Sequence, residues 1–225
     1  MEKEKKNAAI SALNLIKDGQ IIGLGTGSTV YYLITELAKL VKRGLDILCI
    51  PTSISTYLLA VKLGIKLTTL DEHEIVDITI DGADEIDKNL NLIKGGGGAH
   101  TREKILAKAA KKFVVIADFT KYSEVLDLPV PIEVLPFATA FVERELRKIG
   151  GKKVKLRMAK AKAGPVVTDN GNLIFDVDFG EIHKPEELET MLNSIPGVIE
   201  NGIFSGMVNE VHLGTKDGVR ILKPG

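Results

Sequence analysis

Apolar residues in the first half of the chain recur at two different spacings. Spacings of three and four residues predict amphipathic helices over residues 3–17, 28–41, 54–63 and from about 99 onward. Short apolar runs between them predict strands at residues 20–24, 45–50, 65–70, 75–80, 92–93 and 112–118. Because strands and helices alternate, the pattern predicts an α/β fold: a Rossmann-like, mostly parallel sheet covered by helices on both faces.

The pattern changes after residue 128, where Pro129, Pro131 and Pro136 bracket a short strand. The elements predicted next are a helix over about 138–150, strands at 153–157, 165–168 and 172–177, and a helix over 185–193. Asp169-Asn170-Gly171 is a hairpin signal between the last two strands. This β-α-β-β-α-β order is typical of a small ferredoxin-like α+β domain. Residues 207–213 and 219–222 then predict a hairpin that returns to the first sheet.

Composition narrows the class of protein. The 225 residues suffice for one large domain or two modest ones. With 30 basic and 30 acidic residues there is no net charge, which favours a small-molecule partner over nucleic acid or an anionic membrane. The single cysteine, Cys49, cannot form an internal disulfide and indicates a reducing compartment. Without a signal-peptide pattern or an apolar run long enough to span a bilayer, a soluble cytoplasmic protein is expected.

A glycine-rich turn joins the strand at residues 20–24 to the helix that follows. Its residues are Gly25-Thr26-Gly27-Ser28-Thr29. Backbone amides at a helix start, together with hydroxyl groups, favour binding of an anion such as phosphate. Binding of NAD is disfavoured, because Ser28 stands where the dinucleotide fingerprint needs glycine and the next strand ends in Pro51-Thr52-Ser53 without an acid.

Chemically active side chains gather between residues 75 and 106. The apolar run at 75–80 ends in Asp81-Gly82-Ala83-Asp84, which would place carboxylates at the carboxyl edge of the sheet, where open α/β sheets bind ligands. The run at 92–93 is expected to deliver Lys94 in the same way, followed by four glycines whose amides can approach an anion. Taken singly, the acids are also common turn or cap residues and the lysine a common solvated charge.

Glu103 is the candidate general base. It falls in or just after the first turn of the helix that begins near Ala99. Leu106 and Ala107 stand three and four residues further on, so Glu103 shares a helix face with apolar residues. Partial desolvation on such a face makes a carboxylate a stronger base. An acid in a first turn can also simply complement the helix dipole.

In this order and spacing, the motifs resemble those of type A ribose-5-phosphate isomerase. The resemblance covers essentially the whole chain and rests on segments 23–29, 81–85, 94–97 and 101–104, and extends to 130–134, 168–172 and 195–198. It implies a larger domain of residues 1–128 plus 207–225, a smaller inserted domain of residues 129–206, and assembly as a homodimer or homotetramer. It also implies interconversion of D-ribose 5-phosphate and D-ribulose 5-phosphate in the pentose phosphate pathway, without metal or organic cofactor.

The resemblance assigns roles to individual residues. Catalysis would fall to Glu103, Asp81, Asp84 and Lys94, with Glu103 as the proton acceptor. The substrate-binding residues would be Thr26, Gly27, Ser28, Thr29, Asp81, Gly82, Ala83, Asp84, Lys94, Gly95, Gly96, Gly97 and Lys121. Chemically, Glu103 would take the C2 proton, Lys94 and the glycine amides would stabilise the enediolate, and the two aspartates would open the ring and shuttle a proton.

Three other interpretations are open at this point. The same sheet also occurs in non-catalytic sugar-phosphate sensors of repressors, although this chain has no added DNA-binding segment or basic excess. A coenzyme A transferase of similar fold would use a glutamate as nucleophile instead of base. A calcium loop at Asp84, Asp87, Asn89 and Asn91 lacks the required glycine and closing glutamate.

Overall fold

The structure, a computed structural model, describes residues 1–225. The chain forms two compact units. The first contains residues 1–83, 102–121 and 207–225, and the second contains residues 84–101 and 122–206. Residues 84–101 and 122–128 thus belong to the second unit, whereas the domain division expected from the sequence counted them with the first.

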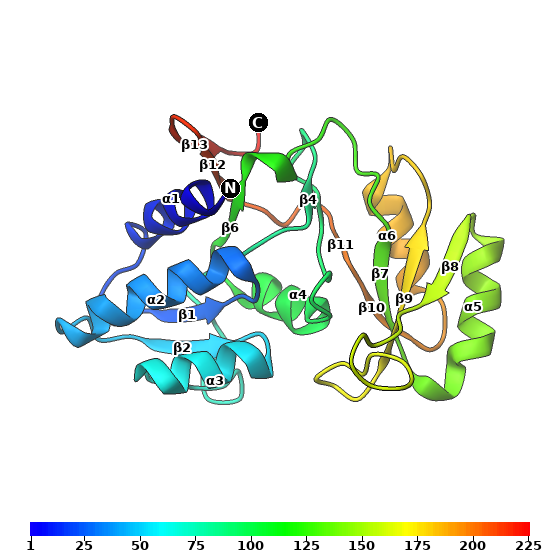
Figure 1. The fold of residues 1–225 in the computed structure, drawn as a ribbon, viewed down its shortest axis with the longest axis horizontal. Helices are drawn as coiled ribbons and strands as arrows, with labels where there is room; N and C mark the ends of the chain where they lie inside the picture. The colour runs from blue at the N-terminus through cyan, green and yellow to red at the C-terminus, as the bar shows by residue number, and fades with distance from the viewer. The chain divides into compact units, whose positions relative to one another are not determined.

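A six-stranded sheet in the order β13-β12-β6-β3-β1-β2 forms the centre of the first unit (Figure 1). Its strands are β1 (Ile21–Leu24), β2 (Leu48–Pro51), β3 (Ile78–Asp81), β6 (Phe113–Asp118), β12 (Glu210–Thr215) and β13 (Gly218–Leu222). All neighbouring strands run parallel except β12 and β13. The predicted mostly parallel sheet is confirmed, as is the C-terminal hairpin, because β12 pairs with β6.

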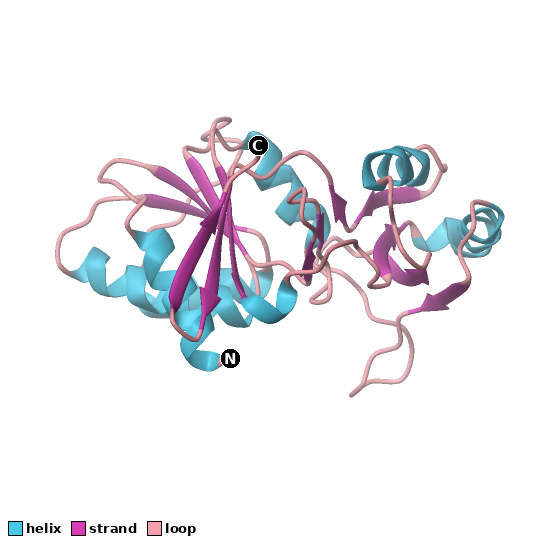
Figure 2. Cartoon of the chain, turned by 90° about the horizontal axis from the view of Figure 1, so that it is seen from above, coloured by secondary structure: helices cyan, strands magenta, loops and turns pink.

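Helices cover this sheet on both faces (Figure 2). The helices of this unit are α1 (Glu2–Leu13), α2 (Ser28–Lys42), α3 (Ile54–Leu63) and α4 (His100–Ala109), whose first two residues belong to the second unit. Residues of α1, α2 and α3 pack on one face with Ile78 and Ile80 of β3. On the other face, Leu106 of α4 packs with Ile50 and Val76. This alternation follows from the two-residue period of a strand.

Two predicted strands are absent. Residues 65–70 contribute a single parallel bridge, between Leu67 and Cys49, and residues 165–168 a single antiparallel bridge, between Pro165 and Met158. Both segments are apolar enough to read as strands, but neither forms a ladder with a neighbour. Helix α1 also ends at Leu13, four residues before the predicted end.

The second unit is built on a four-stranded antiparallel sheet in the order β10-β7-β9-β8. Its elements are β7 (Val130–Val134), the short 3₁₀ helix η2 (Pro136–Ala138), α5 (Thr139–Lys148), β8 (Lys153–Leu156), β9 (Leu173–Asp178), α6 (Pro185–Asn193) and β10 (Val198–Asn201). In chain order this is β-α-β-β-α-β, with the first and third strands adjacent at the centre. The predicted ferredoxin-like domain is confirmed.

A small sheet that the sequence did not predict also belongs to the second unit. Strands β4 (Glu85–Ile86), β5 (Leu92–Ile93) and β11 (Ile203–Phe204) pair antiparallel in the order β11-β5-β4. The expectation that residues 92–93 extend to the same sheet edge as β3 is therefore wrong. The reason is the connection: a turn held by Asp87, which accepts hydrogen bonds from the amides of Asn89 and Asn91, folds β5 back on β4. A parallel neighbour would need a longer crossover.

Candidate active site

The glycine-rich turn has the form of an anion site. It leaves β1 and ends at Ser28, the first residue of α2. The cap residue is Gly27, with φ of 129°, so it has no side chain to bond the amides of the helix start. The first turn of α2 contains no acid, and Ser28 is exposed. Amides and a hydroxyl group at the positive end of a helix dipole are suited to a phosphate group.

A cluster of hydroxyl groups stabilises this turn through hydrogen bonds. The Thr26 hydroxyl lies 2.8 Å from the Thr52 hydroxyl, 2.7 Å from that of Ser53 and 3.1 Å from that of Thr56. Thr56 also donates to the Gly25 carbonyl, at 2.8 Å. This role of Thr52, Ser53 and Thr56 was not predicted from the sequence. The available signal was a run of hydroxyl residues directly after β2, the strand that pairs with β1.

Asp81 is joined to the same turn. It is fully buried at the end of β3, and its Oδ1 accepts hydrogen bonds from the amides of Thr26 (3.0 Å) and Gly82 (2.7 Å). Strands β1 and β3 are neighbours, with Leu24 opposite Ile80, so the two strand ends meet. The structure therefore brings together two motifs that lie far apart in the sequence.

Four further candidates lie in the first unit. Glu103 is in the first turn of α4 and is 4% exposed, next in the chain to other buried residues of that helix. Lys121 ends the short 3₁₀ helix η1 (Phe119–Lys121), directly after β6, and is half-buried. Gly82 and Ala83 are half-buried between β3 and β4.

The remaining candidates form a group of their own in the second unit. Asp84 Oδ2 accepts a hydrogen bond from the Gly96 amide at 2.7 Å, which ties this acid to the glycine loop. A Cβ at position 96 would lie 2.9 Å from Asp84 Oδ1, so glycine allows this approach. Lys94 is 2% exposed, and its Nζ lies 5.5 Å from the centroid of the Phe204 ring. An aromatic face at that distance stabilises a buried ammonium group.

Arg157 holds the glycine loop in place, a role that the sequence analysis missed. Its Nη1 donates to the carbonyls of Gly95 (2.9 Å) and Gly96 (3.2 Å), and its guanidinium forms an ion pair with Asp176. No local sequence signal connects a residue of the second half of the chain to a loop 61 positions earlier.

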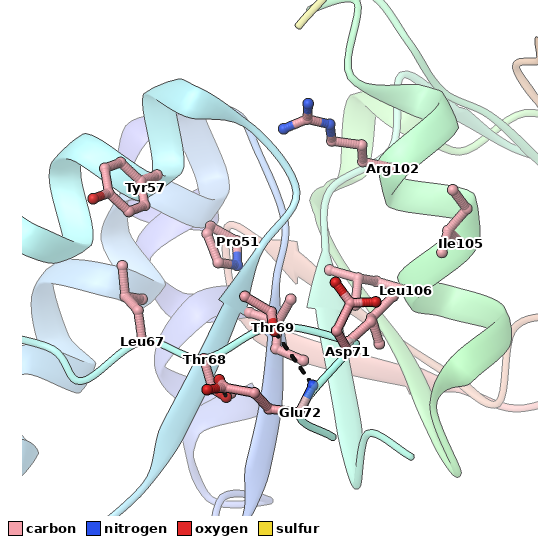
Figure 3. A pocket seen from close by; sticks show the side chains of 12 residues that line it. Pro51, Tyr57, Leu67, Thr68, Thr69, Asp71, Glu72, Arg102, Ile105 and Leu106 are labelled. Carbon is pink, nitrogen blue, oxygen red and sulfur yellow. Dashed lines mark hydrogen bonds between the residues drawn. The ribbon is translucent and has the colours of Figure 1, made fainter. Parts of the chain in front are cut away.

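A cavity of about 590 Å³ lies in the first unit, beside α3 and α4 (Figure 3). Its apolar lining includes Pro51, Tyr57, Leu67 and Leu106, and Arg102 contributes to it from α4. None of the residues predicted to bind substrate lines it.

Nearby, burial raises the pKa of the Cys49 thiol to about 12, so this cysteine stays protonated and is a poor nucleophile. No helix is long and apolar enough to cross a bilayer, and no cluster of three or more His, Cys, Asp or Glu side chains could hold a metal.

Comparisons with known proteins agree on one family. Residues 48–218 match the family described as ribose 5-phosphate isomerase A, or phosphoriboisomerase A. Ribose-5-phosphate isomerase A of Methanosarcina acetivorans is 54% identical, over 96% of this chain and 92% of its own length. That of Methanothermobacter thermautotrophicus is 49% identical, over 97% of both chains.

Solved structures give the same result. Ribose 5-phosphate isomerase A of Methanocaldococcus jannaschii superposes with a TM-score of 0.94 at 48% identity, covering 99% of both chains. A D-ribose-5-phosphate isomerase in complex with phospho-erythronic acid superposes with a TM-score of 0.95 at 47% identity, covering 99% of this chain and 98% of the other. From its fold, its motifs and these matches, the chain belongs to the ribose-5-phosphate isomerase A family.

Proposed function

We propose that this enzyme interconverts D-ribose 5-phosphate and D-ribulose 5-phosphate in the cytoplasm, as a step of the non-oxidative pentose phosphate pathway. The observation that carries the proposal is the joined pair of motifs in the first unit: an uncapped, glycine-rich helix start that suits phosphate, hydrogen-bonded to the buried acid Asp81. The relative that was solved with phospho-erythronic acid supports it, because that compound combines a phosphate with an oxidised sugar carbon.

Substrate anchoring would rest on the phosphate. We assign it to the turn Thr26, Gly27, Ser28 and Thr29, with Lys121 as a further contact. Ser28 is exposed and can donate its hydroxyl directly. Thr26 already uses its amide and hydroxyl within the protein, so its contribution is to fix the shape of the turn.

The reaction itself needs a base at C2 and stabilisation of the enediolate. Glu103 would take the C2 proton and return it to C1. Lys94 and the amides of Gly95 and Gly97 would stabilise the developing oxyanion, while the Gly96 amide, which donates to Asp84, would hold that acid in place. Asp81 and Asp84 would open the ring and move a proton between the two oxygens. Burial supports these assignments, because electrostatic interactions strengthen where water is excluded, and Glu103, Lys94 and Asp81 are each less than 5% exposed.

The decisive experiment is an assay of ketose formation from ribose 5-phosphate, run with and without a metal chelator. We expect turnover in both conditions and a loss of at least about a hundredfold in Glu103→Gln, since a positioned base contributes about 10²–10⁴-fold. Glu124→Gln, at a carboxylate that is 79% exposed, is the matched control and should leave turnover unchanged.

The alternatives give different results in the same assay. A sensor would bind the sugar phosphate and release it unchanged. A coenzyme A transferase would act only when an acyl-coenzyme A and an acceptor acid are supplied, and would form a covalent bond to its glutamate. Near-normal turnover of Glu103→Gln would reject this residue as the base.

We also propose that the chain forms a homodimer or homotetramer through one face of α3. Ile54, Tyr57, Leu58 and Val61 of this face are 49–60% exposed and recur at helical spacing. Contiguous exposed apolar side chains of this kind mark interaction surfaces.

A further inference from the structure

A buried carboxylate in the second unit accepts a hydrogen bond from a residue outside its own sheet. Glu133 lies in β7, fully buried, and accepts hydrogen bonds from four neutral side chains. Three of them, Thr168 (2.8 Å), Asn170 (3.1 Å) and Asn172 (2.8 Å), come from the turn that precedes β9. The fourth is the hydroxyl of Thr101, in the first turn of α4.

Glu133 is ionised in the folded protein. Burial acts to raise the pKa of its carboxyl group, but the hydrogen bonds from Thr101, Asn172, Thr168 and Asn170 outweigh burial and lower the pKa below the usual glutamate value. A carboxylate that accepts several hydrogen bonds at once holds each donor in a narrow range of positions, because charge-assisted bonds are about twice as strong as neutral ones.

We propose that Glu133 and Thr101 are positioning residues for the isomerase reaction, and this inference rests on the proposed role of Glu103 as base. Thr101 and Glu103 belong to the same turn of one continuous helix. Residues two positions apart on a helix point about 200° away from each other. An anchor on the Thr101 side therefore fixes the rotation of the helix start, and with it the direction of the Glu103 side chain on the opposite side.

Thr101 and the three donors in the turn before β9 join Glu133 to different parts of the chain. The three donors in the turn join parts of the same sheet to each other, β7 to the residues that lead into β9. Thr101 instead connects the core strand of this unit to the helix that carries the proposed base. A small rotation there displaces a carboxylate relative to the C2 proton, and a displacement of about 1 Å can lower a rate by about a hundredfold.

The test compares two isosteric substitutions at the same carboxylate. Thr101→Val and Thr168→Val each remove one hydroxyl donor to Glu133. Thr168→Val also removes the acceptor of the Asn170 and Asn172 amides, so its melting temperature should fall at least as far as that of Thr101→Val. We expect kcat to fall by about ten- to hundredfold in Thr101→Val, with KM changed less than about threefold, and to stay near normal in Thr168→Val. Thr101→Ser, which retains the hydroxyl, should restore kcat. Equal kcat in the two valine variants, or no restoration by serine, would overturn the proposal.

A double-mutant cycle provides a second measurement. Because Glu133→Gln and Thr101→Val interrupt the same contact, the double variant should lose no more kcat than the more impaired single variant. Multiplicative losses would show that the two side chains act independently, against the proposal.

Hydrogen exchange separates failure of this inference from failure of the proposed function. Amide protection in the first turns of α4 should fall in Thr101→Val and persist in Thr101→Ser and Thr168→Val, whether or not the chain isomerises ribose 5-phosphate. If the first turns of α4 show this pattern of protection but the wild-type protein does not isomerise ribose 5-phosphate, only the proposed function is refuted. Lost protection with unchanged kcat in an active enzyme would refute the positioning role alone.

Discussion

The Asp81 carboxylate accepts a hydrogen bond from the Thr26 amide at 3.0 Å, although the two residues are 55 positions apart in the sequence. The contact arises because β1 and β3 are parallel neighbours and their carboxyl ends meet. This contact also explains why residue 25, between β1 and Thr26, is a glycine. A Cβ at position 25 would lie 2.0 Å from Asp81 Oδ1 and 2.6 Å from Asp81 Cα, where no side chain fits.

Replacement of Gly25 by alanine should therefore disrupt both motifs at once. The Asp81 backbone cannot move away without breaking the β1–β3 pairing, so we expect Gly25→Ala to lower the free energy of unfolding by about 3 kcal/mol or more, beyond the usual range for overpacking. Gly97→Ala, where nothing lies within 4 Å of an added Cβ, should unfold like the wild type. Urea titrations of both variants check this, and equal stabilities would contradict the crowding argument.

The exposed hydroxyl group at the start of α2 should contribute mainly to binding. A hydrogen bond to a charged group contributes about 1.5–3 kcal/mol, so Ser28→Ala should raise KM for ribose 5-phosphate by roughly ten- to hundredfold while kcat changes little. Steady-state kinetics check this, with Ser55→Ala on the exposed side of α3 as the control. An unchanged KM would remove Ser28 from the phosphate site.

Much of the fold follows from local pattern. The long alternation of apolar runs and amphipathic helices predicts the central sheet, and the element order of the second half predicts the ferredoxin-like domain. The apolar segments at 65–70 and 165–168 show the limit of this approach, because an extended apolar segment becomes a strand only if a neighbour pairs with it. The sheet of β4, β5 and β11 was also missed, since β11 is two residues long and pairs with a strand more than a hundred positions earlier.

The candidate residues could be chosen from motif and resemblance, but their supports could not. Arg157 and Glu133 act on segments far away in the sequence and carry no local signature. The same holds for the hydroxyl cluster behind Thr26, whose members are ordinary cap and strand-end residues when read alone. These supporting residues can be identified only when the order of the strands is known, and that order depends on the pairing of the whole sheet.

Acid should weaken the second unit through Glu133. Its pKa is lower in the folded than in the unfolded chain, so its stabilising contribution is complete above the unfolded value, about 4.3, and is lost as the pH falls through the folded value. Glu133→Gln should be less stable than wild type at pH 7 and lose less stability on further acidification. Unfolding titrations between pH 7 and about pH 3 check this, with Glu124→Gln as control. Parallel pH curves for wild type and Glu133→Gln would exclude Glu133 as an acid-labile group.

A charge placed on the exposed face of α3 should separate the subunits. Leu58 is the most exposed of the four apolar residues of this face, at 60%, so lysine there fits the isolated chain but would leave an unpaired ammonium group in a contact between copies. We expect Leu58→Lys to reduce the molar mass in sedimentation equilibrium to that of a smaller species, while circular dichroism stays that of a folded chain. Met191→Lys on α6 replaces another exposed apolar side chain, 43% exposed, and should leave the mass unchanged. If Leu58→Lys sediments like the wild type, the subunits meet through another surface, and the apolar face of α3 needs a different explanation.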